Sequence, residues 1–591
     1  MPLESHQTAL DPITLEVVRN GLIATVKEMT DNLVRTAYSP IAAEIKDFSV
    51  GLLDTAGDSI MQAPYAAPAF IADLDATIRA GAHLIGLDGF EPGDVVLCND
   101  AQTNGQHLNN MAAYSPIFEG GELVAFCAVR SHWIDVGGKI SGSMSVDARD
   151  IFAEGFQLPT VKVYRAGKPD AQILRFIQAN SRFPELVLGD MRAQISACGL
   201  GERRYRELIA RYGRRTVREC IEHIWNENEL LARAAVQAIP DGTYEASCVL
   251  DNDGITLDRP IPLKVKVIVA GSEMTIDFTG TSPQVQGPYN SRSAEAVARI
   301  AFKYFTTPEL PANAGAFRNL KIVCPEGTVL SADGRAPMAW WNMPVNSSID
   351  LVLRALYAAL PEGVTAGHSD NIGSAQLAGI DPRTGKPFQT FIPYAGSWGA
   401  TSAADGASAI VSLIQGDVRL MPVELRENMF PLRIREFSLR ADSGGPGRFR
   451  GGLGVRIDQQ ALTDCSYQAQ YERTLDPPWG LCGGRNGEVT RTWRERTGTN
   501  EREPLPFKCN DLPFKAGDTE VLLTAGGGGY GPPFERDPKR VREDVLNGYV
   551  STESARRDYG VAIDAQTLEI DAALTESLRK RMRADFQLKE K

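Results

Sequence analysis

Histidine is scarce in this sequence of 591 residues, which has six, and its nine cysteines are scattered without any Cys-x-x-Cys pair. An odd number of dispersed cysteines argues against a disulfide framework and against a zinc knuckle held by thiolates. We therefore expect reduced, mainly buried thiols, which are typical of a cytoplasmic protein.

Basic residues are also outnumbered by acidic ones. The sequence has 62 Lys and Arg residues and 74 Asp and Glu residues, which gives a net charge of −12. Binding to nucleic acid phosphates requires a basic surface, so we expect no nucleic acid partner. The N-terminal segment lacks the basic and apolar parts of a secretory signal, and no apolar run approaches the roughly 18 residues of a membrane span. We expect neither export nor membrane insertion.

Common nucleotide-binding and hydrolase motifs are missing as well. The sequence contains no GxxxxGK[ST], no GxGxxG between a strand and a helix, and no GxSxG. Any ATP that this system uses is therefore expected to bind to another chain. The glycine-rich segments that begin at Asp442 and Gly526 are interpreted as tight turns with positive φ. The alternative is an anion-binding loop that includes Arg448 and Arg450.

The periodicity of apolar residues predicts a mixed α+β fold of several domains. Apolar side chains three or four apart predict a helix over Pro12–Thr36, and similar patterns predict helices over 70–87, 184–237, 294–305 and 349–360. Breaks are expected at Gly199–Gly201 and Gly213. Runs of β-branched residues predict strands over 48–53, 59–62, 94–98 and 122–129. We expect an N-terminal α/β domain (1–240), a middle α+β domain (241–440), and a β-rich, glycine-rich C-terminal domain with terminal helices (441–591).

Two histidines follow predicted strands directly, which is where sites are often built. His107 lies in a polar loop after the strand that ends at Cys98, and His132 lies in a polar segment after the predicted strand 122–129. If these strands are neighbours, their loops meet, and Asp47 adds a carboxylate. Two imidazoles and an oxygen donor suit a divalent ion such as Zn²⁺ or Mn²⁺. The alternative is that both histidines are structural.

Other candidate residues carry weaker signals. His368 lies in a later loop and is a candidate catalytic base, although no nucleophile is marked for it. Trp340 and Trp341 are expected to pack in a core, with an aromatic wall of a substrate site as the alternative.

Several blocks occur in the same order as in the hydantoinase B/oxoprolinase family, which the sequence therefore resembles over nearly its whole length. The blocks are DPITLEVVRNGL, KDFSV, CNDAQTNGQHLNN, SHWIDVGG, IFAEGFQLPTVKVY, DSGGPGRFRGGLG and AGGGGYGPPFERDPKRVREDVLNGYVS. The resemblance implies a partner subunit, similar to hydantoinase A, that uses ATP and Mg²⁺ to activate the substrate. The present chain would receive the activated intermediate.

The resemblance also implies a divalent metal held at the positions of Asp47, His107, Asn110 and His132. Family members have Asp where this sequence has Asn110. A neutral amide in place of a carboxylate weakens a site for hard cations. Asp135 is expected to contact a metal-binding histidine on the side away from the metal and so to fix its orientation, a role that carboxylates often take.

Two reactions are consistent with this resemblance, and a noncatalytic assembly subunit is a third alternative. The first is ketone carboxylation, similar to that of acetophenone carboxylase and its hydantoinase B-like delta subunit, in which an enol phosphate and carboxyphosphate derived from bicarbonate form a C–C bond to give a 3-oxo acid. The second is ATP-dependent hydrolysis of a cyclic amide, as in hydantoinase, 5-oxoprolinase or lactamase. Asn110 favours the ligase reaction, because C–C bond formation does not need a metal-bound hydroxide.

Overall fold

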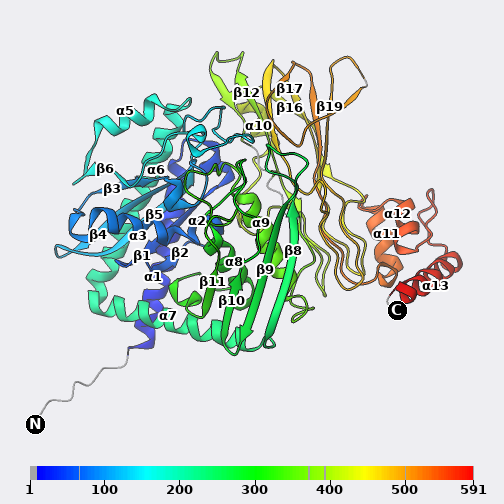
Figure 1. The fold of residues 1–591 in the computed structure, drawn as a ribbon, viewed down its shortest axis with the longest axis horizontal. Coiled ribbons are helices and arrows are strands. Elements are labelled where there is room, and N and C mark those ends of the chain that lie inside the picture. Colours follow the sequence, from blue (N-terminus) through cyan, green and yellow to red (C-terminus); the bar gives the residue numbers. More distant parts are fainter. Residues whose placement is uncertain (1–9, 65–66, 370–372, 392–393, 500, 590–591) are drawn as a thin grey trace, which may run out of the picture.

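Two regions covered by helices are followed along the chain by a β-rich region and terminal helices (Figure 1). The computed structural model describes residues 10–64, 67–369, 373–391, 394–499 and 501–589. Within these residues, no helix is long and apolar enough to cross a membrane. Helices alternate with several mainly antiparallel sheets, so the predicted α+β class is confirmed.

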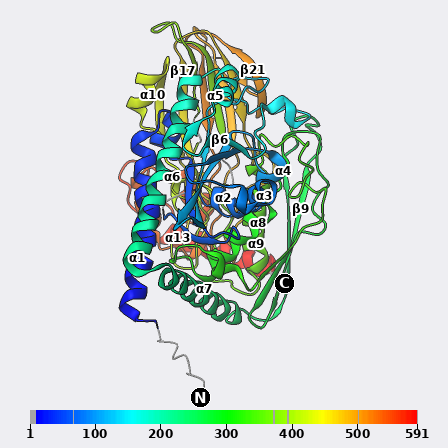
Figure 2. The same cartoon turned by 90° about the vertical axis from the view of Figure 1, so that its left-hand side faces the viewer.

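The first region is built on a seven-stranded antiparallel sheet in the order β2-β1-β5-β4-β3-β6-β7. Helices α1 (Pro12–Thr36) and α6 (Pro184–Tyr212) run side by side along it (Figure 2). The apolar stripe that predicts α1 is buried against α6 and the sheet. The strands are β1 (Phe48–Leu53), β2 (Ser59–Gln62), β3 (Val95–Cys98), β4 (Asn110–Glu119), β5 (Glu122–His132), β6 (Val161–Arg165) and β7 (Lys168–Pro169).

Helix α6 continues through Gly199–Gly201, where the sequence predicts a break, so that prediction is wrong. A Cβ at Gly201 would lie 2.4 Å from Met29 Sδ of α1. Glycine therefore serves close packing between the two helices instead of ending one. The break at Gly213 is confirmed, because Gly213 has a φ of +83° and α7 (Arg214–Gln237) begins directly after it.

Two further predictions for the first region are wrong. Strands β3 and β5 are not neighbours, because β4 lies between them. The sequence pattern does not predict β4, because this strand follows the polar loop directly and contains Pro116, and proline is rarely found inside strands. The helix expected over 70–87 is divided into α2 (Pro68–Ile71) and α3 (Leu74–Ile85), because the chain turns at 72–73.

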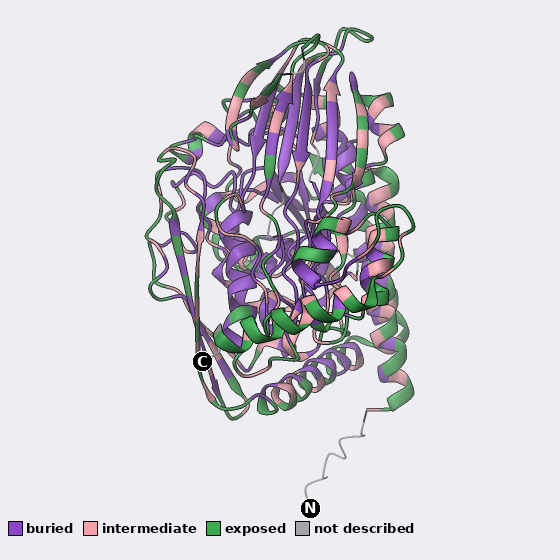
Figure 3. Cartoon of the chain, turned by 90° about the vertical axis from the view of Figure 1, so that its right-hand side faces the viewer, coloured by how far each residue is buried: buried purple, intermediate pink, exposed green. Residues whose placement is uncertain are grey.

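The second region combines a four-stranded sheet, in the order β11-β10-β9-β8, with buried helices. Helix α9 (Asn342–Leu356) begins before its predicted start at Ile349, and nearly all of its residues are buried (Figure 3). A helix surrounded by protein lacks the one-sided stripe on which the prediction depends. The other elements are β8 (Gly242–Leu250), β9 (Ile261–Ala270), β10 (Glu273–Asp277), β11 (Leu320–Val323) and α8 (Ala294–Thr306).

Two larger sheets, in the orders β13-β12-β18-β21 and β16-β17-β22-β19-β20, and the two-stranded sheet of β14 (Gly396–Ser397) and β15 (Ser408–Ile410) form the third region. The boundary predicted at residue 440 does not coincide with a structural break, because β16 and β17 pair across it and β12 pairs with β18. The strands are β12 (Ser374–Ile380), β13 (Pro387–Gln389), β16 (Leu432–Leu439), β17 (Val455–Ala461), β18 (Cys465–Gln470), β19 (Arg491–Glu495), β20 (Arg502–Pro504), β21 (Lys508–Phe514) and β22 (Thr519–Leu523). Helix α10 (Val423–Met429) precedes β16, and α11 (Pro538–Leu546), α12 (Thr552–Tyr559) and α13 (Ala572–Lys589) close the chain.

The predicted turns with positive φ occur only at single positions of the glycine-rich segments, at Asp442 with a φ of +59° and at Gly531 with a φ of +73°. The glycines of 526–529 have no positive φ, and their successive N–H groups donate to carbonyls at Glu488, Gly452, Gly367 and Arg485. A Cβ at any of them would lie within 1.7–2.5 Å of a backbone oxygen of another segment. Glycine is required here because extended backbones pack directly against one another, as they do around the axis of collagen.

Candidate functional site

The register of the N-terminal sheet brings three predicted site residues into one row. Asn110, the first residue of β4, is the direct cross-strand partner of His132, the last residue of β5. Asp47 precedes β1, and its carbonyl oxygen accepts a hydrogen bond of 3.1 Å from the His132 N–H. Directly opposed residues of antiparallel strands carry their side chains on one face, about 4.5–5.5 Å apart. The side chains therefore meet because β1, β5 and β4 are neighbours.

His107 joins this row from the loop between α4 (Ala101–Asn104) and β4. Its Nδ1 lies 3.0 Å from the carbonyl oxygen of Ala339, and its Nε2 lies 3.2 Å from His132 Nδ1. A carbonyl only accepts hydrogen bonds, so His107 Nδ1 carries the proton and Nε2 presents a lone pair. Burial lowers the pKa of His107 to about 4, and the imidazole is therefore neutral at pH 7.

The lone pair of His107 faces a second acceptor atom. Asn110 Oδ1 lies 2.8 Å from His107 Nε2. The orientation of the amide is fixed, because Asn110 Nδ2 donates to Gln106 Oε1 at 2.8 Å and Gln106 Nε2 donates to Asp73 at 3.2 Å. Two acceptors at this distance repel each other unless a cation lies between them, and a neutral His107 offers no proton there. The arrangement therefore fits a bound metal cation.

The separation of the two histidines fits the same interpretation. Two imidazole nitrogens that bind one zinc-sized ion at roughly 2.0–2.1 Å lie about 3.3 Å apart in tetrahedral geometry, close to the 3.2 Å between His107 and His132. Asp47 Oδ2 lies 3.8 Å from His132 Nδ1. Among the described residues, no three His, Cys, Asp or Glu side chains form a group arranged to hold an ion. A site with three or more protein ligands therefore depends on the amide of Asn110.

Burial determines the charge of the site. It raises the pKa of Asp47 to about 7. It also lowers the pKa of His132 well below its ordinary value, and the neighbouring His107 lowers it further. Near neutral pH the two imidazoles are uncharged, and Asp47 is the group that changes protonation state.

The histidine pair borders a small cavity of about 40 Å³. Neither Lys nor Arg is among the lining residues. The lining consists of Asp47, Ala67, Ala69, Phe70, His107, His132, Met144, Trp340, Trp341, Asn342, Ser374, Phe391, Ile414 and Gln415.

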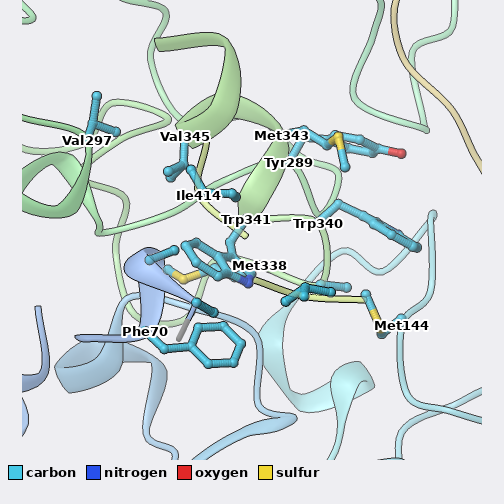
Figure 4. Packing of buried hydrophobic residues seen from close by; sticks show 14 of the residues in the cluster. Phe70, Met144, Tyr289, Val297, Met338, Trp340, Trp341, Met343, Val345 and Ile414 are labelled. Atoms are coloured by element: carbon cyan, nitrogen blue, oxygen red, sulfur yellow. The ribbon is translucent and has the colours of Figure 1, made fainter. Parts of the chain in front are cut away.

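Aromatic rings enclose this cavity. Figure 4 shows the Trp341 indole above the Phe70 ring, with Trp340 and Met144 to one side. The centroid of Trp341 lies 6.0 Å from that of His107 in an edge-to-face arrangement, and Phe391 stacks on His132 at 4.7 Å. The rings exclude water, so that hydrogen bonds within the cavity are stronger than they would be in solution.

Four lining residues have buried polar atoms without a hydrogen-bond partner in the part of the chain that the structure describes. They are two N–H donors, Trp340 Nε1 and Trp341 Nε1, and two amide oxygens, Asn342 Oδ1 and Gln415 Oε1. A buried polar group without a partner costs about 1–3 kcal/mol. Uncompensated donors and acceptors at one cavity therefore indicate a ligand that supplies the missing partners.

The two predicted catalytic residues lie elsewhere. Asp135 accepts hydrogen bonds from the Arg182 backbone N–H at 2.7 Å, from Arg182 Nη1 at 2.8 Å and from Ser143 Oγ at 3.1 Å. It holds its own loop, and these partners do not include the histidine that it was predicted to orient. His368 Nε2 lies 3.8 Å from Asp350 Oδ1, outside the lining of the histidine cavity. A catalytic role for His368 stays a prediction.

Part of the cavity was not found from the sequence. Trp340 and Trp341 are buried in the core, as predicted, and they also line the cavity, so that a role as the wall of a substrate site stays a prediction. Asn342 and Gln415 were missed, because no motif links them to residues more than 200 positions earlier. The only signal near Asn342 is the adjacent pair of tryptophans.

Known proteins are similar in sequence to nearly the whole of this chain. The family model for Hydantoinase B/oxoprolinase matches residues 11–533. The B component of a putative D-/L-hydantoinase from Pseudomonas sp. (strain NS671) is 33% identical over 97% of this chain and 98% of its own length. The beta component of the caprolactamase from Pseudomonas jessenii is 31% identical over 96% of this chain and 99% of its own length.

Solved structures agree with the sequence comparison. A crystal structure of ATP-dependent caprolactamase from Pseudomonas jessenii superposes with a TM-score of 0.91 and 30% identity, covering 97% of this chain and all of that chain. A nucleotide-free structure of acetone carboxylase has a TM-score of 0.89 and 22% identity, covering 98% of this chain and 84% of the other, and shares the fold. The chain belongs to the hydantoinase B/oxoprolinase family.

Proposed function

We propose that this chain is the subunit of an ATP-dependent enzyme that completes the hydrolysis of a cyclic amide. One observation carries the choice: the cavity has unpaired acceptors as well as unpaired donors. A cyclic amide offers an N–H and a C=O side by side, whereas a ketone has no N–H for Asn342 or Gln415. The names of the hydantoinase and caprolactamase relatives support the same reaction class.

Each part of the cavity has a role in this proposal. The indole N–H groups of Trp340 and Trp341 bind the carbonyl oxygen, and the amide oxygens of Asn342 and Gln415 receive the ring N–H. Asp47, His107, Asn110 and His132 would hold a divalent ion, which supplies Lewis-acid activation of the carbonyl or of water. The aromatic walls exclude bulk water from a labile activated intermediate. ATP and Mg²⁺ are used by a hydantoinase A-like partner subunit.

Ketone carboxylation is the second candidate, and Asn110 favours it. An amide oxygen carries no charge, so the site holds a divalent cation less tightly than a site with a second carboxylate would, and a metal-bound hydroxide would be present less often. Formation of a C–C bond from an activated ketone and bicarbonate does not need that hydroxide.

Co-expression with the partner subunit separates the two reactions. We expect ATP-dependent opening of a hydantoin or a lactam, measured by chromatography of the product, without incorporation of labelled bicarbonate. Incorporation of label into acetone or acetophenone, with no ring opening, would contradict amide hydrolysis and support ketone carboxylation.

The indole N–H of Trp341 provides a direct test of the cavity. Trp341→Phe keeps an aromatic ring but removes the donor, and we expect kcat/KM for the cyclic amide to fall about tenfold or more, because one buried hydrogen bond is worth roughly 1–3 kcal/mol. Trp493→Phe, in β19 and outside the cavity lining, is the matched control and should leave kcat/KM unchanged. Equal activity of both variants would exclude Trp341 as a substrate ligand.

Metal binding should strengthen as the pH rises from 6 to 8. The metal-free protein holds Asp47 with a pKa of about 7, so a proton competes with the cation below pH 7, while His107, with a pKa of about 4, is already neutral. At pH 6 only about a tenth of Asp47 is ionised, which predicts about tenfold weaker binding of Zn²⁺ or Mn²⁺ than at pH 8. Calorimetry in two buffers at pH 6 should report the release of about one proton. Asp47→Asn should abolish this pH dependence, and an unchanged dependence would assign the proton to another group.

A further inference from the structure

A second cavity, of about 760 Å³, lies where α8, the segment 308–318 and the segment 410–417 meet the N-terminal sheet region. It is much larger than the histidine cavity of about 40 Å³. Its volume lies in the range of roughly 300–1,000 Å³ that is typical of small-molecule sites. No role in the proposed reaction accounts for it.

The walls of this large cavity are mainly apolar. Phe317 and Trp398 provide aromatic surface, and Leu310 and Ile410 stand at its edge with 38% and 36% of their surface exposed. Large apolar side chains are seldom left in water next to a cavity unless a ligand or a partner covers them. The walls therefore suit a ligand whose body is apolar.

Three of the four cationic side chains that line the cavity are neutralised by carboxylates. Arg79 pairs with Asp58 at 2.8 Å, Arg299 pairs with Asp75 at 3.0 Å, and Arg318 pairs with Glu229 at 3.1 Å. These guanidinium groups stabilise the protein's own structure and leave little charge for a ligand.

Lys303, on α8, is the exception. Its ammonium group donates to Thr307 Oγ1 at 2.6 Å, and it forms no ion pair with any described carboxylate, including the lining residues Glu309 and Asp417. Burial lowers the pKa of Lys303 to about 8, and no neighbouring acid opposes that shift. The ammonium group of Lys303 is half-buried, faces an apolar cavity, and has N–H donors left over after its bond to Thr307. It therefore lacks a counter-ion among the described residues.

The large cavity is separate from the histidine cavity but shares a wall with it. Pro68 and Ala72 face the large cavity, whereas Ala69 and Phe70, between them in the sequence, face the histidines. The Ala69 N–H donates to the Ile414 carbonyl at 3.1 Å and closes this wall. A molecule in the large cavity therefore lies beside the histidine cavity and not within it.

We propose that the large cavity binds a small anion with an apolar body, a carboxylate or a phosphate monoester, with Lys303 as its counter-ion. The ammonium group of Lys303 donates to the anionic oxygens, and the surfaces of Phe317 and Trp398 cover the body. The proposal goes beyond amide hydrolysis and does not depend on it, because none of these residues lines the histidine cavity.

Titration calorimetry of the full-length chain tests the proposal with four probes: benzoate, phenyl phosphate, phenol and inorganic phosphate. We expect benzoate or phenyl phosphate to bind at least about tenfold more tightly than phenol, because a charge-assisted hydrogen bond is worth more than about 1.4 kcal/mol. Inorganic phosphate should bind more weakly than phenyl phosphate. The preferred probe identifies which anion class the site takes.

Variants assign the binding to this cavity. Lys303→Met should remove the preference for the anionic probe, Lys303→Arg should restore most of it, and Lys168→Met, an exposed lysine on β7, should change nothing. Binding should also alter tryptophan fluorescence, and Trp398→Phe should remove that change while calorimetric binding persists. Phenol binding as tightly as the anions, an anion preference retained in Lys303→Met, or no binding of any probe at about 10 mM would each overturn the proposal.

Discussion

Asn110→Asp should tighten the binding of Zn²⁺ or Mn²⁺ by at least about tenfold. The substitution places an anionic oxygen where Asn110 Oδ1 now lies 2.8 Å from His107 Nε2. Coulomb attraction at contact distance in a partly buried site exceeds the roughly 1.4 kcal/mol that a tenfold change requires. It also adds a second carboxylate to the proposed set of Asp47, His107 and His132. Metal content after gel filtration and calorimetric titration measure the effect, and unchanged affinity would show that no cation binds between these residues.

The activity of the same variant separates the two proposed reactions. If the chain completes amide hydrolysis, a more tightly held cation should raise ATP-dependent ring opening. If it forms a C–C bond, the variant should gain metal occupancy with unchanged or poorer coupling of ATP to product, because a metal-bound hydroxide would destroy the activated intermediates. Thermal unfolding of the variant is the control, since the Gln106 contact of Asn110 is lost.

Local patterns predict the elements that have one face on the core and one in water. Helix α1 begins and ends at the residues that the sequence predicts. Strands β1 and β2 do so too, and β1 is found although it is buried at every position, because a turn signal at 55–58 separates the two apolar runs. The stripe of α1 is buried on one side only, so its periodicity is visible. The part of helix α9 before Ile349 and strand β4 escape detection, because they are buried on all sides and lack that contrast. Alternation of polar and apolar residues indicates an element that has one face in water. Elements buried on all sides need not show this alternation, so the pattern can miss them.

The candidate site shows the same division. His107 and His132 are recognisable because each follows an apolar run and few other histidines compete. Their approach to 3.2 Å depends on the insertion of β4 between β3 and β5, which the sequence does not reveal. The polar atoms of Asn342 and Gln415 come from distant segments that meet the histidines only in the folded chain. Their hydrogen-bonding deficit is a property of three-dimensional packing, and no motif encodes it.

Gly527→Ala should destabilise the protein severely, with most of the chain lost to aggregation or a thermal midpoint lowered by about 10 °C. A Cβ at Gly527 would lie 2.0 Å from the carbonyl oxygen of Trp398 and 2.9 Å from Gly399 N, both backbone atoms that cannot rotate away. The segment cannot shift either, because the Gly527 N–H donates to Gly452 O at 2.9 Å and the Gly445 N–H donates to Gly527 O at 2.7 Å. Relief of the overlap requires breaking such bonds at a cost on the order of 3 kcal/mol or more.

Gly199→Ala is the matched control that distinguishes close backbone packing from the general effect of replacing a glycine. Gly199 lies inside α6, and an added Cβ there meets no atom within 4 Å. Alanine is favoured over glycine in a helix by about 1 kcal/mol, so this variant should be as stable as the wild type or slightly more stable. Differential scanning fluorimetry and soluble yield compare the two. If Gly527→Ala unfolds at the wild-type temperature, close backbone contact is not the reason for glycine at 526–529. The glycines would then serve chain flexibility, and the interpretation of this segment as a turn would be favoured.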